Sequence, residues 1–411
     1  MKISLPYGKE TIEVDVAETQ LIAVLEPNDV PKCTDPIKAV KDAITNPEGA
    51  GSFSDFLSGS GQLLVIINDG TRPTPTRIVL EAIADELDEA GAEFIIATGV
   101  HRVPTEEEFS FIFGTLWPRF KDRVSVHDAR ADEMYRLGLT SRGTEVFLNT
   151  RVMDAERIMI IGSVEPHYFA GFTGGRKGFL PGVAAFSTIE QNHSLALSSK
   201  AKNLSLLGNP VHEDMLEACG MIDKKVYTIM TVLDRDQEIY AVAAGGLYAA
   251  FDKAVERSRE VFIVPLAEKA DVVVACVRPP MDIDLYQSHK AIENAKPALK
   301  NGGALILVSS CRDGIGEAAF CNLLSSCSSP EAVFKKIAKG YKLGHHKAAK
   351  IAELCGKARV MAYTKLDDST LENIFIEPVV NLQETLDELL SVTDSRIIFL
   401  PDASVTVPMT E

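Results

Sequence analysis

Residues 63–76 read LLVIINDGTRPTPT, and this stretch decides the class of fold. It opens with five apolar residues, and a short apolar run bounded by turn residues is typical of a buried strand. The polar turn NDGTRP follows, and a helix is predicted from about Pro75 to near Gly91. The apolar face of this helix carries Val79, Ile83 and Leu87. A strand, a turn and a helix in succession form the basic unit of a parallel α/β sheet.

The same succession recurs along the chain. Two further helix starts have capping-box spacing, Thr105 with Glu108 and Ser187 with Glu190, and another helix is predicted from about Leu285. Strands that are rich in Val and Ile and alternate with helices predict an α/β fold of two lobes. Each lobe should contain a mostly parallel sheet, with an active-site cleft between the lobes. The predicted strands are residues 63–67, 94–97, 157–161, 271–277 and 304–308.

The length of the chain and a charged stretch indicate where the lobes divide. The 411 residues correspond to two or three domains at roughly 150 residues each. Residues 267–270, Ala-Glu-Lys-Ala, separate two halves that both repeat the strand–helix pattern. We therefore expect an N-terminal domain of residues 1–268 and a C-terminal domain of residues 269–411.

Composition excludes several classes of protein. The 42 Lys and Arg against 58 Asp and Glu give a net charge of −16, which argues against non-specific nucleic-acid binding. The clearly apolar runs are far shorter than the ~20 residues that span a bilayer, and the N-terminus lacks the apolar core of a signal peptide. The seven cysteines form no CxxC pair, so we expect reduced thiols in a cytoplasmic protein rather than disulfides or structural zinc.

Chemically unusual residues follow the predicted strands. Open α/β sheets bind ligands just past the carboxyl ends of their strands, which marks Asp69, Arg72, His101 and His167. Arg72 has the geometry to hold a substrate carboxylate, or it could pair with Asp69 to fix the turn. The two histidines are either ordinary loop residues or a pair of acid/base groups. Two such groups on opposite faces of one carbon suit a racemase, which must handle both enantiomers.

The glycine-rich segment 171–178, GFTGGRKG, is the densest glycine cluster in the chain. It fails the P-loop spacing, because Arg176 stands where that pattern needs glycine. Gly174 and Gly175 would still allow backbone N–H groups to approach an anion. Lys177 could be a covalent anchor, by a Schiff base or another linkage, or a solvated lysine on a flexible loop.

The residue pattern alone leaves the roles of His193 and of the pair Gln287 and Lys290 open. His193 is a weak metal candidate, because no HExxH motif and no second histidine at ligand spacing accompany it. Gln287 and Lys290 share one helical face near a helix start. They could close over a substrate carboxylate, or form an ordinary solvated face.

The motifs together resemble one family. NDGTRP, TGVHR, EPHYFAGFTGGRKGFLPG, NHS, GNPVHEDM and LYQSHK occur in the order and approximate spacing of the nickel-dependent lactate racemases. The resemblance implies an isomerase with a nickel-pincer nucleotide, a pyridinium-3,5-bisthiocarboxylate-type mononucleotide that holds nickel. It also implies partner proteins that synthesise this cofactor and insert the nickel, so protein from a host without them is expected to lack it.

The resemblance implies a role for each matching residue. Lys177 would bind the cofactor covalently, within a cofactor loop that includes Gly174, Gly175 and Arg176, and His193 would be the nickel ligand. His101 and His167 would be the acid/base pair. Asp69, Arg72, Gln287 and Lys290 would bind the substrate, a small 2-hydroxy acid.

The implied reaction is reversible hydride transfer from substrate C2 to the cofactor through a 2-keto acid. The alternatives are a nickel-independent α/β enzyme with a Schiff base on Lys177, and a non-catalytic relative that binds a ligand.

The chain departs from lactate racemases at Gly70, where they carry His, and at Gly178, where they carry Ser. The sequence therefore predicts a 2-hydroxy acid without specifying which one, and it leaves the oligomeric state open. Despite the net negative charge, Arg72, Arg176, Lys177 and Lys290 are expected to form a local positive region.

Overall fold

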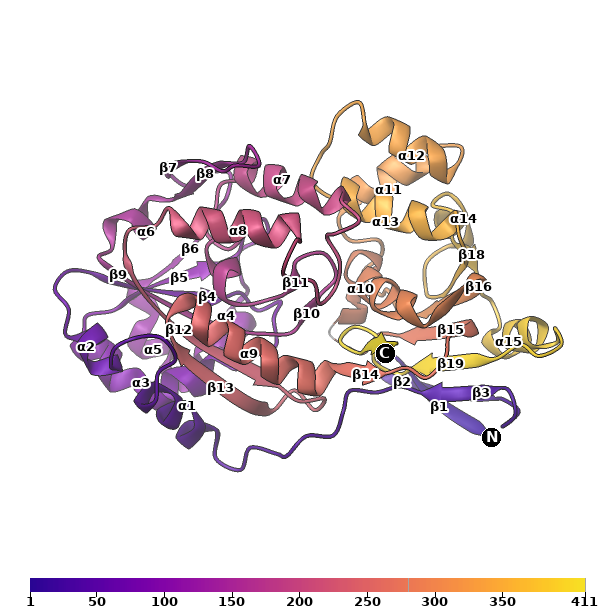
Figure 1. Ribbon diagram of the computed structural model, residues 1–411, viewed down its shortest axis with the longest axis horizontal. Coiled ribbons are helices and arrows are strands. Elements are labelled where there is room, and N and C mark those ends of the chain that lie inside the picture. The colour runs from indigo at the N-terminus through magenta and orange to yellow at the C-terminus, as the bar shows by residue number, and fades with distance from the viewer. Residues whose placement is uncertain (280, 411) are drawn as a thin grey trace. The chain divides into compact units, whose positions relative to one another are not determined.

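The computed structural model describes residues 1–279 and 281–410, and it divides into two compact units. The central unit comprises Asp29–Val261, and the terminal unit comprises Met1–Asn28 with Phe262–Glu411. Each unit contains one six-stranded sheet and its own helices (Figure 1). The predicted α/β class with mostly parallel sheets is confirmed.

The sheet of the central unit is parallel except at one edge. β13 pairs antiparallel with β12, and the other neighbours pair in parallel. Strands β4 and β9 lie at the middle and are almost entirely buried, which explains their apolar runs. The strands, in sheet order, are β13(Ile239–Gly245), β12(Lys225–Leu233), β9(Arg157–Ser163), β4(Leu63–Asn68), β5(Glu93–Ala97) and β6(Val124–Val126).

The helices of this unit follow its strands. The predicted helix after β4 is confirmed as α3(Thr76–Glu89), with Val79, Ile83 and Leu87 buried. The capping box of Thr105 and Glu108 is also confirmed, at the start of α4(Glu106–Phe113). The other helices are α1(Pro36–Thr45), α2(Phe53–Leu57), α5(Trp117–Phe120), α6(Thr150–Asp154), α7(Phe186–Ser194), α8(Pro210–Gly220) and α9(Leu247–Phe262). Two hairpins complete the unit, β7(Met134–Leu139) with β8(Glu145–Asn149) and β10(Pro166–His167) with β11(Gly171–Phe172).

The predicted cap of α7 is wrong. The helix begins at Phe186 after Ala185, and no side chain caps it. Ser187 therefore lies inside the first turn, where its hydroxyl cannot serve as the N-cap.

The sheet of the terminal unit is parallel throughout. Its strands, in order, are β18(Glu377–Pro378), β17(Arg359–Tyr363), β16(Leu299–Val308), β15(Ala270–Cys276), β19(Ile397–Leu400) and β3(Leu21–Val24). Two short sheets accompany it, β1(Lys2–Tyr7) with β2(Glu10–Asp15) and β14(Ile263–Pro265) with β20(Val407–Met409). The helices are α10(Leu285–Ala295), α11(Ala318–Ser325), α12(Pro330–Ile337), α13(His345–Cys355), α14(Asp368–Glu372) and α15(Leu382–Leu390). The chain also forms 3-10 turns η1(Gly114–Leu116), η2(Lys121–Arg123), η3(Gly175–Gly178), η4(Leu195–Leu197), η5(Met281–Ile283) and η6(Lys296–Ala298).

The division between the units differs from the predicted domains 1–268 and 269–411. β3 joins the edge of the terminal sheet, where Leu21 pairs with Ile397. Ile3 and Leu5 of the N-terminal hairpin pack in the same core as Phe399. The first 28 residues therefore belong with the C-terminal part of the chain, which local sequence patterns cannot reveal because the pairing spans the whole chain.

Two expectations from composition can be compared with the described residues. All seven cysteines are free thiols. Within residues 1–279 and 281–410, no helix is long and apolar enough to cross a membrane.

Candidate active site

Asp69 and His101 meet at the edge of the central sheet. β4 and β5 are parallel neighbours that end together, with Asn68 in register with Ala97, so the turns that follow them lie side by side. Nδ1 of His101 lies 2.7 Å from Oδ2 of Asp69, and the Asp69 carboxylate is buried while the imidazole is partly exposed. The carboxylate orients the ring and favours the proton on Nδ1, which leaves Nε2 to exchange a proton.

The charge of Asp69 is stabilised where it lies. Burial by itself would raise the pKa of Asp69, but the hydrogen bond and charge of His101, together with the Thr71 hydroxyl, outweigh it. The pKa of this carboxyl is therefore below its usual value. Thr71 donates from Oγ1 to Oδ1 at 2.7 Å. Asp69 is an anion that can stabilise the imidazolium form of His101 when that ring accepts a proton.

Arg72 has a partner that the sequence reading missed. Its Nη1 donates to Oε1 of Glu165 at 3.3 Å, so the ion pair that fixes the turn is with Glu165 rather than with Asp69. Ser163, at the end of β9, donates to the other oxygen of Glu165. The parallel pairing of β4 with β9 brings residue 165 to residue 72. The sequence did offer a signal for this pair: Glu165 comes just after the predicted strand 157–161, which neighbours the strand that leads to Arg72.

His167 and Lys177 are adjacent, because the β10–β11 hairpin folds the loop back on itself. Lys177 Nζ lies 3.1 Å from His167 Nε2, and the backbone N–H of Ala170 donates to His167 Nδ1 at 3.3 Å. A neutral ring that accepts at Nδ1 carries its proton on Nε2. In that tautomer Nε2 faces the Lys177 amine, so the ring and the amine lie close enough to exchange a proton.

Phe169 links these two residues to His193. Its ring meets the His167 ring edge-on with centroids 4.5 Å apart, and the His193 ring with centroids 5.0 Å apart. Lys177 Nζ lies 5.5 Å from the same ring centre. The structure thus brings together His167, Lys177 and His193 around one aromatic side chain, which no sequence pattern had marked.

His193 is held as a neutral imidazole. Burial and the nearby Lys177 ammonium both disfavour its charged form, whereas the Ile189 backbone acts in the opposite direction, and together they lower the pKa of His193 to about 3. Neutral imidazole is the form that binds a metal.

The glycine loop is organised by contacts within the protein. Gly174 and Gly175 both have positive φ, 78° and 52°. A Cβ at Gly174 would lie 2.6 Å from a methyl group of Val164, and one at Gly175 would lie 3.0 Å from the Phe251 ring. Both positions therefore require glycine for the loop to pack.

Arg176 does not have the predicted cofactor-binding arrangement. Its side chain is almost completely buried and lies over the Phe251 ring at 4.5 Å. Burial lowers its pKa to about 9. The guanidinium donates to four backbone carbonyls, those of Ala170, Phe172, Thr173 and Gly174. Because both Nη groups donate inside the loop, Arg176 supports the loop conformation and adds no exposed positive charge.

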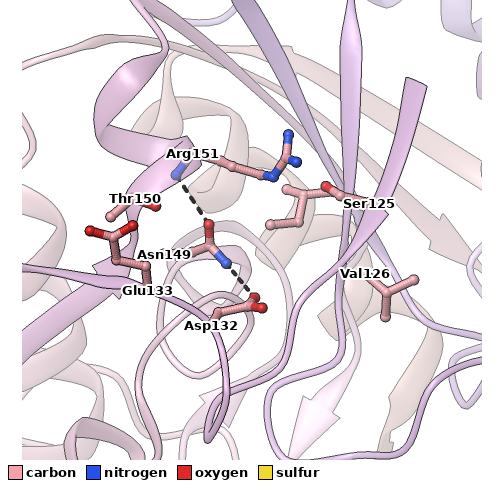
Figure 2. Close-up of a pocket in the computed structure, with 8 residues that line it drawn as sticks. Ser125, Val126, Asp132, Glu133, Asn149, Thr150 and Arg151 are labelled. Carbon is pink, nitrogen blue, oxygen red and sulfur yellow. Dashed lines mark hydrogen bonds between the residues drawn. The ribbon is translucent and has the colours of Figure 1, made fainter. Parts of the chain in front are cut away.

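A buried histidine lies behind both loops. His127 Nε2 lies 3.0 Å from the Ala184 carbonyl, in the segment after Lys177, and its own carbonyl accepts from Thr98, at the start of the His101 turn. Asn149 Nδ2 is 3.2 Å from His127 Nδ1 and also donates to Asp132 at 2.6 Å (Figure 2). This network joins the two loops without reaching the site.

The remaining predicted residues belong to the terminal unit. The Asp284 side chain accepts from the Gln287 backbone N–H at 2.7 Å and caps α10, which begins at Leu285 as predicted. Gln287 and Lys290 are both partly exposed on this helix. The expected positive region is smaller than predicted, because Arg176 is buried and Arg72 is paired with Glu165.

The fold and these contacts define an α/β protein with histidine, lysine and carboxylate side chains gathered past the carboxyl ends of parallel strands. Residues 7–205 match the family model of the lactate racemase N-terminal domain, and residues 266–407 match that of the C-terminal domain. The chain belongs to the lactate racemase family and is therefore an isomerase of the racemase type.

Two curated relatives carry the name lactate racemase. The protein from Thermoanaerobacterium thermosaccharolyticum is 30% identical over 97% of both chains. That from Lactiplantibacillus plantarum is 29% identical over 80% of this chain and 79% of its own.

Solved structures agree with the fold. The lactate racemase apoprotein from Thermoanaerobacterium thermosaccharolyticum superposes with a TM-score of 0.92 at 29% identity, covering all of both chains. A Thermotoga maritima protein, at 16% identity, has a TM-score of 0.71 over 92% of this chain and 99% of its own, which shows the fold alone.

Proposed function

We propose that this protein is a nickel-pincer-nucleotide-dependent racemase or epimerase of a small 2-hydroxy acid. The arrangement of Lys177, His167 and His193 around Phe169 carries the proposal. A covalent anchor, an acid/base group and a neutral metal ligand are the three side chains that such a cofactor needs. The Asp69–His101 pair would be the second acid/base group.

The donor set fits a metal whose other ligands come from a cofactor. Among the described residues, no group of three or more His, Cys, Asp and Glu side chains is arranged to hold a metal ion. A single neutral His193 beside a reactive lysine matches a nucleotide that is attached to Lys177 and supplies the remaining donors. When bound, this group would accept a hydride from substrate C2 and return it, with a 2-keto acid between the two transfers.

The side chains of this protein would move the hydroxyl proton and hold the carboxylate. His101 Nε2 would take the hydroxyl proton of one enantiomer, and buried Asp69 would stabilise the resulting imidazolium. His167 would do the same for the other enantiomer. Arg72 has five N–H donors, of which Glu165 engages one in the structure, so it can bind a substrate carboxylate as well. Gln287 and Lys290 keep their proposed role in binding the substrate.

Intact mass and nickel content test the proposal. The protein should be produced in cells that also make the cofactor and the proteins that insert nickel. We expect one adduct, lost in Lys177→Ala, and about one nickel per chain, as the single attachment lysine and single histidine ligand imply. A lactate racemase expressed in the same cells is the loading control. Absence of both adduct and nickel while that control is loaded would refute the proposal.

A panel of enantiopure 2-hydroxy acids then identifies the substrate. The same substrate tests the reaction. Racemisation in deuterated water should leave the C2 hydrogen largely unexchanged, because a hydride that is transferred to the cofactor and back does not exchange with solvent deuterons. Rapid deuterium incorporation at C2 would instead support proton abstraction from carbon, without hydride transfer to a cofactor.

A further inference from the structure

A buried carboxylate holds helix α7 next to the candidate metal ligand. Asp214, on α8, is fully buried. Its Oδ2 accepts from Asn192 Nδ2 at 2.8 Å and from Thr144 Oγ1 at 2.8 Å, and its Oδ1 accepts from Thr140 Oγ1 at 2.6 Å. Asn192, itself fully buried, immediately precedes His193 on α7. One carboxylate thus connects α8, α7 and the turn between β7 and β8.

The three hydrogen-bond donors are neutral groups. Burying a carboxylate costs free energy that hydrogen bonds offset only when their geometry is good, and an apolar group of similar size is often equally stable or more stable. Core packing alone therefore gives no reason for an acid at this position. Three directional bonds to one carboxylate do fix α7, through Asn192, and the β7–β8 turn relative to α8.

A second set of hydrogen bonds joins α7 to β8. Thr188 accepts from the Phe147 backbone and donates to the Glu145 carbonyl, and Gln191 accepts from the Glu145 N–H. These bonds attach the helix to β8. Asn192, one residue before His193, supplies the bonds to α8: its Nδ2 donates to Asp214 Oδ2 at 2.8 Å and to the Val211 carbonyl at 3.3 Å.

Helix α8 is also bonded to the backbone of Phe169, whose ring packs against His193. Asn209, the N-cap of α8, donates from Nδ2 to the Phe169 carbonyl at 2.9 Å. The motifs NHS and GNPVHEDM are thereby joined through Asn192 and Asp214, and both are joined to the segment that carries His167. Asp214 itself touches none of the proposed catalytic groups.

We propose that Asp214 and Asn192 are a positioning pair that fixes the imidazole of His193 for metal binding. This inference rests on the proposed function for the identity of His193 as the nickel ligand. It assigns the two residues a role through α7 rather than through contact with substrate or cofactor. Groups that orient a metal ligand typically change metal affinity by about 10–100-fold when they are removed.

A reciprocal exchange tests the pair in the loaded enzyme. Asn192→Asp places two carboxylates against each other in a buried position, so we expect nickel to be released to a chelator roughly 10–100-fold faster. Combining it with Asp214→Asn restores one amide donor and one carboxylate acceptor, and release should return to within about threefold of the wild-type rate. Asn192→Ala, which removes the donor without adding charge, provides a second single variant in case Asn192→Asp fails to fold.

The control is Glu217→Gln. Glu217 lies on α8 and accepts from the backbone and hydroxyl of Ser141 in the β7–β8 turn, but it does not bond to α7. The Glu217→Gln variant should therefore release nickel at the wild-type rate. The Lys177 adduct, measured by intact mass, should persist in all variants, which separates loss of nickel from loss of cofactor.

Either of two results would overturn the inference: wild-type nickel release in folded Asn192→Asp or Asn192→Ala, or no recovery in the exchanged pair. If the wild-type protein carries no nickel when a lactate racemase does, the proposed function fails instead. The pair is then judged by hydrogen exchange of the α7 amides in the apoprotein. Faster exchange in the single variants and recovery in the exchanged pair would support a fixed α7, and equal exchange would refute it.

Discussion

The imidazole of His101 depends on one carboxylate for its orientation, so the first prediction concerns Asp69. Asp69→Asn preserves the size of the side chain but removes the charge that favours an Nδ1 proton and stabilises the imidazolium. We expect kcat of the loaded enzyme to fall roughly 10²–10⁴-fold, the range for acid/base catalysis. Nickel content should not change. Activity within twofold of wild type would remove Asp69 from the proton-transfer step.

Gly70 is the departure from lactate racemases that the structure explains best. A Cβ at this position would lie 2.6 Å from Glu108 Cγ, so the Glu108 side chain fills the space of a larger residue. Glu108 is fixed there by Arg102, through bonds of 2.7 and 2.9 Å. The presence of glycine at position 70 and the position of the Arg102–Glu108 pair are therefore coupled.

This coupling predicts a non-additive double variant. Gly70→His alone should destabilise the protein by about 1–3 kcal/mol, because it overpacks a filled position. Glu108→Gly removes both the Cγ at 2.6 Å and the Cβ at 2.7 Å from the added Cβ, so the space is open. Part of that loss should then be recovered, despite the loss of the capping box and the cost of glycine in a helix. Thermal unfolding of the two single variants and the double variant measures the coupling. Strictly additive shifts would show that Glu108 does not restrict residue 70.

At the scale of elements, the glycine loop owes its conformation to Arg176. Arg176→Met would leave buried carbonyls without their donor, at about 1–3 kcal/mol for each group that stays unsatisfied. We therefore expect a lower unfolding temperature together with loss of the Lys177 adduct. Arg259→Met is the matched control, since Arg259 donates to a single carbonyl, that of Leu204. Loss of the adduct at unchanged stability would instead support the original prediction that Arg176 binds the cofactor.

The whole chain shows what its sequence could predict. The strands were readable because a central parallel strand such as β4 is buried on both faces, which requires a continuous apolar run. The carboxyl ends of those strands pointed to Asp69, His101 and His167, and the structure places Asp69 against His101 and His167 against Lys177. Glu165, Phe169 and Asp214 escaped notice because their partners lie far away in sequence and their residue types are common. Likewise, the pairing of β3 with β19 connects the two ends of the chain.

Buried histidines should make the whole molecule sensitive to acid. Burial lowers the pKa of His127, His193, His212 and His289, to about 3 for His193 and His212. The ordinary pKa of histidine is about 6.5, so above that pH these four side chains are unprotonated in both the folded and the unfolded state. As the pH falls below about 6.5, the unfolded state takes up more protons at these positions than the folded state, so stability falls. For His193 and His212, with a pKa of about 3, the loss is about 1.4 kcal/mol per pH unit for each group.

The single tryptophan allows this to be measured in the central unit. Trp117 lies on α5, so its fluorescence during urea unfolding reports the unit that contains three of the four histidines. Between pH 7 and pH 5, the apoprotein should become progressively less stable. His212→Phe, which removes one titrating group stacked near Phe251, should reduce that loss by roughly 2 kcal/mol at pH 5. His345→Gln, in the terminal unit, should leave the transition unchanged. The same pH dependence in His212→Phe and wild type would mean that His212 already binds its proton in the folded state.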